Sequence, residues 1–131
     1  MAASPAFAAT PVTWSGLVPA TADTSLTAPT NATTLGTAGA NGTQVNEIVC
    51  QGVGTTAAGV VNVFLHDGST YHLVDQFLVP VITSSTTAVA WRATRTYNNL
   101  WLPSNSWSLR CTVTVAGDQS MVKVTAFGGS L

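Results

Sequence analysis

The sequence predicts an all-β fold, an antiparallel jelly-roll-like β-sandwich of about eight short strands with an extended N-terminal arm. Two observations carry this prediction. Short segments alternate between apolar and polar residues, and turns containing glycine, aspartate or proline separate them, while no window shows the 3.6-residue apolar period of a helix. An immunoglobulin-like sandwich is the alternative, but the separation of Cys50 and Cys111 and their placement relative to the tryptophans weigh against it.

Residues 1–42 are predicted to form the arm, separate from a sandwich domain over residues 43–131. This first segment is rich in Ala, Thr, Ser and Pro, and proline removes a backbone donor and opposes long regular elements. Only residues 11–14 have the pattern of a short strand. A disordered tail is the alternative, but four apolar residues are suited to docking on the body or on a neighbouring chain: Trp14, Leu17, Val18 and Leu26.

The strands of the sandwich are expected from residue 43 onward. Their ranges are 44–51, 59–67, 71–79, 86–95, 98–103, 107–116 and 121–127. Asp67-Gly68 is a strong hairpin signal because glycine accepts a positive φ, and Pro80 is expected at a strand end. The clearest half-buried strand is 107–116, whose apolar positions run in register from Trp107 through Val115.

The charge content is unusually low. Charged residues make up 7% of the 131-residue chain, the net charge is −1, and the only cations are Arg92, Arg95, Arg110 and Lys123. Nucleic-acid binding and polybasic membrane attachment are therefore not expected, since both need clustered cations. A neutral surface of Thr, Ser, Asn and Gly favours a subunit that lives in an assembly. An ordinary extracellular β-domain is the alternative.

Targeting and cysteine signals are weak. Residues 1–9 lack the charged and apolar regions of a signal peptide, and no apolar run has the length of a membrane span. Cys50 and Cys111 could form one disulfide, but both lie in apolar strand-like segments and are expected as buried free thiols. No spacing of Cys and His suits a structural zinc site.

Residues 64–77 hold both histidines of the chain. With a two-residue loop, Gly68–Ser69, His66 pairs with Tyr71 and the histidines point to opposite faces. With a three-residue loop, His66 pairs with His72. Asp75 is expected on the other face from His72, so even the second register leaves too few ligands for a metal, and a polar hairpin tip is favoured.

No other constellation suggests catalysis. The sequence has no GxSxG elbow, and its five acidic residues are scattered. We therefore expect no enzyme activity, no catalytic residues, no metal and no cofactor. For the four tryptophans, we expect a place in the core first, a protein interface second and a surface for stacking on carbohydrate third. Trp107 is assigned to the core, while Trp91, Tyr97 and Trp101 join Trp14, Leu17, Val18 and Leu26 as candidate interface residues. The strand arginines could pair with acids across subunits or face solvent.

Residues 40–131 resemble small structural proteins of tailed bacteriophages. The resemblance lies in residues 40–79 (ANGTQVNEIVCQGVGTTAAGVVNVFLHDGSTYHLVDQFLV), 94–113 (TRTYNNLWLPSNSWSLRCTV) and 124–131 (VTAFGGSL). These motifs are turns and strand cores rather than chemistry. The resemblance implies a jelly-roll cement or decoration protein on the capsid surface, made in the host cytoplasm. Its expected partners are the major capsid protein and itself, as a dimer or trimer.

The sequence leaves three hypotheses for the function of this protein. The first is a capsid decoration protein whose arm and outward apolar residues add contacts to several shell proteins. The second is a tail- or fibre-associated protein that binds glycans through Trp91 or Trp101. The third is a small enzyme that uses His66 and His72, and it requires that His72→Ala abolish an activity.

Overall fold

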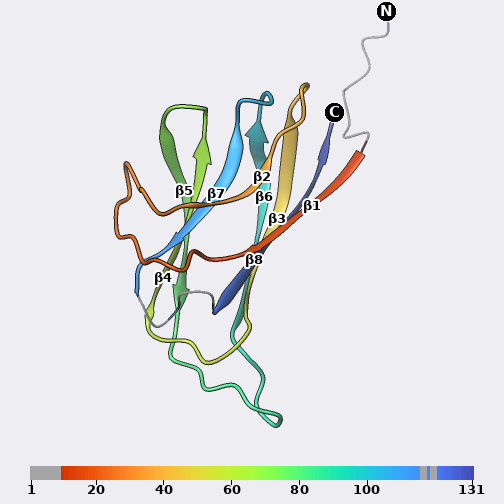
Figure 1. Cartoon of the computed structure of the whole chain (residues 1–131). Helices are drawn as coiled ribbons and strands as arrows, with labels where there is room; N and C mark the ends of the chain where they lie inside the picture. The colour runs from red at the N-terminus through yellow and green to blue at the C-terminus, as the bar shows by residue number, and fades with distance from the viewer. Residues whose placement is uncertain (1–9, 116–117, 119–120) are drawn as a thin grey trace, which may run out of the picture.

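The computed structural model describes residues 10–115, 118 and 121–131, and it folds as eight β-strands in two four-stranded sheets (Figure 1). The all-β prediction is confirmed. The strands are β1 (Thr10–Leu17), β2 (Thr33–Thr37), β3 (Thr43–Gly52), β4 (Gly59–His66), β5 (Tyr71–Val79), β6 (Arg92–Leu102), β7 (Ser108–Val113) and β8 (Val122–Ser130).

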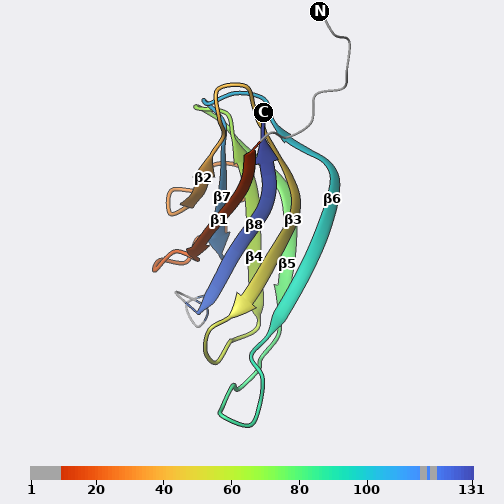
Figure 2. The ribbon, with the colours of Figure 1, turned by 90° about the vertical axis from the view of Figure 1, so that its right-hand side faces the viewer.

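The strand order is that of a jelly roll. Sheet A has the order β1-β8-β3-β6 and sheet B the order β2-β7-β4-β5, with every pair antiparallel (Figure 2). The pairs β1–β8, β2–β7, β3–β6 and β4–β5 are the successive pairs of one long hairpin. Rolling that hairpin up places its pairs alternately in the two sheets, so that each strand faces the core with one side.

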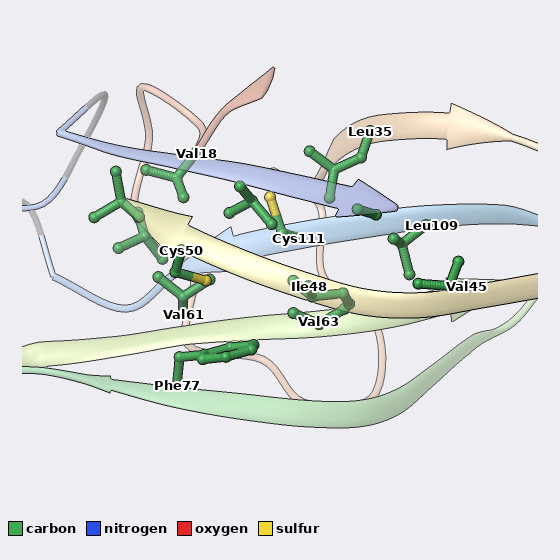
Figure 3. Close-up of a cluster of buried hydrophobic side chains, with 14 of the residues drawn as sticks. Val18, Leu35, Val45, Ile48, Cys50, Val61, Val63, Phe77, Leu109 and Cys111 are labelled. Carbon is green, nitrogen blue, oxygen red and sulfur yellow. The ribbon is translucent and has the colours of Figure 1, made fainter. Parts of the chain in front are cut away.

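The core lies between the sheets and is built from β-branched and other apolar side chains (Figure 3). Phe77, Leu109 and Val63 are among its fully buried members. Cys50 and Cys111 are buried in it as free thiols, as predicted, and burial raises the pKa of each to about 12. A thiol with that pKa stays protonated at neutral pH and packs as a small apolar side chain.

Residues 10–42, predicted as part of a separate arm, contribute two strands to the sandwich instead. β1 forms an edge of sheet A against β8, and β2 forms an edge of sheet B against β7. Proline is tolerated at an edge strand because one side of the backbone needs no partner, so Pro11 does not prevent pairing. Residues 1–9 of the predicted arm lie outside the described residues.

The segments 86–95 and 98–103, predicted as two strands, differ in the structure. A single strand, β6, runs from Arg92 to Leu102, and residues 86–91 belong to the loop before it. The partner strand explains the late start, because Gln51 pairs with Arg92 and β3 ends one residue later. Beyond that point the alternating Ala and Val residues have no neighbouring strand to pair with.

The sandwich has two distinct ends. The β3–β4 and β5–β6 connections, residues 53–58 and 80–91, lie at one end together with the described residues of the β7–β8 connection, 114–115, 118 and 121 (Figure 1). We call this the loop end. The short turns β2–β3, β4–β5 and β6–β7 lie at the other, which we call the hairpin end. No helix among the described residues has the length and apolar character needed to cross a membrane.

Candidate interaction surface

Exposed apolar side chains gather at the loop end. Among the described residues, eleven large apolar side chains are exposed, and six of them lie in the three loops or in the strand ends beside them. Val89 is 90% exposed, the highest value of the eleven. The others at this end are Leu17, Val53, Leu78, Val81 and Met121.

The same loops carry no exposed charge. Asp118 is the only charged residue in the three loop sequences, and it is fully buried. Its Oδ1 accepts a hydrogen bond of 2.7 Å from the backbone N–H of Ala57, which ties the β7–β8 loop to the β3–β4 loop. Removing water from a surface of apolar and hydroxyl side chains costs less free energy than removing it from charged groups. The centres of protein interfaces are depleted in charged residues for this reason.

Backbone and side-chain hydrogen bonds hold the long β5–β6 loop in place. The Thr56 hydroxyl donates to the carbonyl of Pro80 at 2.8 Å, and the N–H of Gly52 donates to the carbonyl of Trp91 at 2.6 Å. A hollow of about 640 Å³ lies between this loop and β3, and its lining includes Val53, Val89 and the first residue of β6, Arg92. Val81 and Val89 therefore lie on a loop that is fixed at both ends.

The seven residues predicted for an interface do not form one surface. Val18 and Trp91 are buried in the core, with 2% and 7% of the residue exposed, so both pack within their own chain and cannot contact a partner. Trp14 and Tyr97 are partly buried against the core. The three exposed residues lie apart: Leu17 at the loop end, Leu26 in the β1–β2 connection, and Trp101 at the hairpin end near Gly42.

The hairpin has the two-residue loop. His66 pairs with Tyr71, and Asp67 pairs with Thr70 around Gly68, whose φ is +105°. The two histidines therefore point to opposite faces of sheet B, as the first of the two registers predicts. Within the described part of the chain, no three His, Cys, Asp or Glu side chains are close enough to share a metal ion.

Each histidine has a local partner. The His66 ring lies 4.4 Å from the Tyr71 ring, and partial burial and the Arg110 charge lower the pKa of His66. His72 Nε2 lies 3.0 Å from Asp67 Oδ2, and its ring stacks on Trp107. Hydrogen bonds from His72 and from the turn lower the pKa of Asp67. These contacts are those of a hydrogen-bonded turn.

Asp75 lies on the same face as His72, contrary to the prediction. A β-bulge at Val74 shifts the register, so Asp75 pairs with Val63 and turns toward the space between the sheets. There it accepts hydrogen bonds from the Arg95 guanidinium and the Tyr97 hydroxyl, both on β6. Asp75 therefore joins the edge strands of the two sheets.

The strand arginines are mostly engaged within the chain. Arg95 pairs with Asp75, and Arg110 donates to the Tyr71 hydroxyl at 2.9 Å and to the Ser108 hydroxyl at 3.0 Å. Arg92 makes no side-chain hydrogen bond or ion pair with any described residue. Of the three strand arginines, only Arg92 therefore remains a candidate for an ion pair with an acidic residue of another subunit.

The loop end was not predicted from the sequence. Val89 was placed in a strand, where its β-branched side chain fits, and Val53 lies in a short stretch that contains no charge. A signal was present: the three loop sequences combine apolar residues with Ser, Thr and Gly and hold one charge, Asp118, although loops of ordinary domains are more polar.

Comparisons with known proteins leave the family open. No protein-family model matches the chain, and no curated protein matches it. Among solved structures, the chain is similar to a chain of "Structure of infectious bursal disease virus Gt strain", with 18% identity and a TM-score of 0.32. The match covers 98% of this chain and 33% of the viral chain, so this chain spans about a third of that one. A likeness at this TM-score carries no inference about function.

Proposed function

We propose that this chain is a non-enzymatic structural protein of a virion, a cement or decoration protein on the capsid of a tailed bacteriophage. The observation that supports it best is the loop end, where six exposed apolar side chains occur in or beside three loops that carry no exposed charge. The sequence resemblance of residues 40–131 points to the same class. In this proposal the loop end binds the outer shell across junctions between capsomers.

The energetics suit attachment to a repeating surface. Burying an exposed Val or Leu side chain contributes about 1.5–3 kcal/mol. Part of the free energy gained by burying six such side chains offsets the translational and rotational freedom that is lost on binding. One copy of the protein is therefore expected to bind one site on the shell with modest affinity. Attachment at many equivalent positions, or through more than one copy at a time, makes modest contacts act together.

A glycan-binding protein of the tail or fibre is the second candidate. The observation that favours it is Trp101, which is 38% exposed at the hairpin end and could stack on a sugar ring. Trp91, the other tryptophan considered for that role, is buried. One exposed tryptophan makes a small platform, so this candidate stands second.

Rebinding to particles separates the two candidates. Particles assembled without the protein are mixed with purified protein, sedimented, and assayed for bound copies and for resistance to heat. The decoration role predicts saturable binding to the shell and a raised disassembly temperature. Binding to immobilised polysaccharide, with no binding to the shell, would move the protein to the second candidate.

A further inference from the structure

Three charged side chains without partners share one face of the sandwich. Of the nine charged residues in the chain, six are buried or make hydrogen bonds through their side chains, Asp23 for example with the backbone N–H groups of Ser25, Thr30 and Asn31. The other three make no such contact with any described residue, and all three line a hollow of about 440 Å³ on the outer face of sheet A. They are Glu47, Arg92 and Lys123.

The strand registers place these charges in two rows. Gln51 on β3 pairs with Arg92 on one side and with Lys123 on the other, so one row reads Arg92, Gln51, Lys123. The next outward-facing row holds Thr94, Val49 and Thr125, which carry no charge. The third row reads Thr96, Glu47, Phe127.

This pattern is complementary to itself. A two-fold axis that runs across the strands at Val49 exchanges the first row with the third. It would place Glu47 of one copy over the partner's Gln51, between the partner's Arg92 and the partner's Lys123. Neighbouring strands lie about 4.8 Å apart, so one carboxylate can reach both cations.

We propose that the outer face of sheet A is a homodimer interface, in which two copies pack face to face with antiparallel strands. Each Glu47 then lies between two cations of the other copy, and the contact occurs twice, as a closed two-fold interface requires. The middle row carries no charge, so no like charges meet at the axis when two sheets pack about 10 Å apart. Val49 at its centre is 6% exposed within one copy, and Thr94 beside it is exposed. Phe127, which is 41% exposed, faces the partner's Lys123.

The dimer is expected to be weak in solution. Four strands of about eight residues give a contact of about 500 Å² per copy, which is at or below the lower limit for specific complexes. The charge pairs would be partly exposed to solvent, so added salt weakens them. The inference does not rest on the proposed function, because it concerns the purified chain alone.

The symmetry has a consequence for assembly. An axis across the strands reverses strand direction, so the two loop ends point away from each other at opposite extremities of the dimer. If the loop end binds a shell, one dimer has two attachment points and could bridge neighbouring sites.

Charge reversal tests the interface. Sedimentation velocity of the wild type from about 1 μM to about 1 mM covers the affinity range of weak complexes. We expect a monomer–dimer equilibrium, which Glu47→Lys weakens by about tenfold or more because like charges then face each other. The double variant Arg92→Glu/Lys123→Glu is expected to lose self-association in the same way.

Mixing the two variants gives the sharpest outcome. Each repels itself, but together they restore opposite charges at both contacts, so a heterodimer should form. Asn105→Lys, an exposed position at the hairpin end, controls for added charge and should leave the dimer intact. A wild type that stays monomeric to about 1 mM, a trimer, or a Glu47→Lys variant that self-associates as strongly as the wild type would each overturn the proposal.

Discussion

Trp14 lies directly against the backbone of Gly36. A β-carbon added at Gly36 would be 2.1 Å from Cδ2 of Trp14, far inside van der Waals contact. β1 and β2 are in different sheets, so this contact closes the side of the sandwich where both are edge strands. Trp14 therefore serves the fold of its own chain, and glycine at residue 36 is needed for close approach rather than for backbone freedom.

Gly36→Ala is expected to lower the free energy of unfolding by about 1–3 kcal/mol, the usual cost of overpacking. Equilibrium unfolding in urea measures the change. Gly39→Ala is the matched control, because its added β-carbon would meet nothing closer than 3.5 Å. Equal stability of the two variants would show that Trp14 does not pack on Gly36.

Asp75 is the main polar link between β5 and β6. Its side chain is 8% exposed and accepts hydrogen bonds from Arg95 and Tyr97. Burial and the Asp75 carboxylate raise the pKa of the Tyr97 hydroxyl, so it remains a donor. The Arg95 guanidinium also lies 5.1 Å above the Phe77 ring, which joins this polar link to the core.

Tyr97→Phe should cost about 1–3 kcal/mol of stability at neutral pH, because one oxygen of a buried carboxylate loses its donor. Tyr71→Phe, the control, removes an acceptor of Arg110 that keeps its bond to Ser108, and it should cost less. The folded pKa of Tyr97 lies above the unfolded value of 10.0, so its contribution is complete below pH 10 and is lost as the pH rises further. The stability difference between wild type and Tyr97→Phe should therefore shrink above pH 10.

At the scale of single strands, the sequence predicted the elements but not their irregularities. Alternation located six of the eight strands and the hairpin turn, because a half-buried strand must alternate, and residues 11–14 were predicted as a short strand within β1. Only β2 was not predicted. Bulges were not predictable. Residues 97–99 of β6 face Asn46 alone on β3. This shift lets both Val45 and Ile48 face the core although they are three positions apart in the strand.

The candidate surface was harder to predict than the fold. Alternation of apolar and polar residues assigns side chains to the two faces of a sheet only where a strand pairs with a neighbour. The loops of the loop end do not belong to paired strands. The residues chosen from the sequence were large apolar ones, and an isolated pattern cannot say whether such a residue fills the core or meets a partner. Trp91 filled the core, whereas the smaller Val89 is exposed.

The loop end can be tested without disturbing the fold. Val53→Asp/Val89→Asp places two charges on side chains that are 54% and 90% exposed, so the melting temperature should change little. Binding to depleted particles should fall by about tenfold or more, since each buried charge costs more than the apolar contact it replaces. Asn105→Asp at the hairpin end is the control and should bind as the wild type does. Wild-type binding should also persist in moderate salt, because the three loops carry no exposed charge whose interactions salt could screen.

At the scale of the whole molecule, the two surfaces divide the work of assembly. The loops of the loop end are apolar and carry no exposed charge, whereas the outer face of sheet A holds the three unpaired charges. A jelly roll separates such surfaces well, because its loops project from the ends of the sheets and its outer faces remain free. The two surfaces meet at Gln51 and Arg92, which line both hollows, and the proposed shell and dimer contacts otherwise use different residues.

The copy number of this protein in the virion tests whether it decorates the shell. Quantitative mass spectrometry of purified virions gives the amount of this protein relative to the major shell protein. We expect a copy number comparable to that of the shell protein, because a decoration protein binds at repeated sites over the shell. A few copies per particle would place the protein at the tail or a vertex, and its absence from particles would exclude a role in the virion.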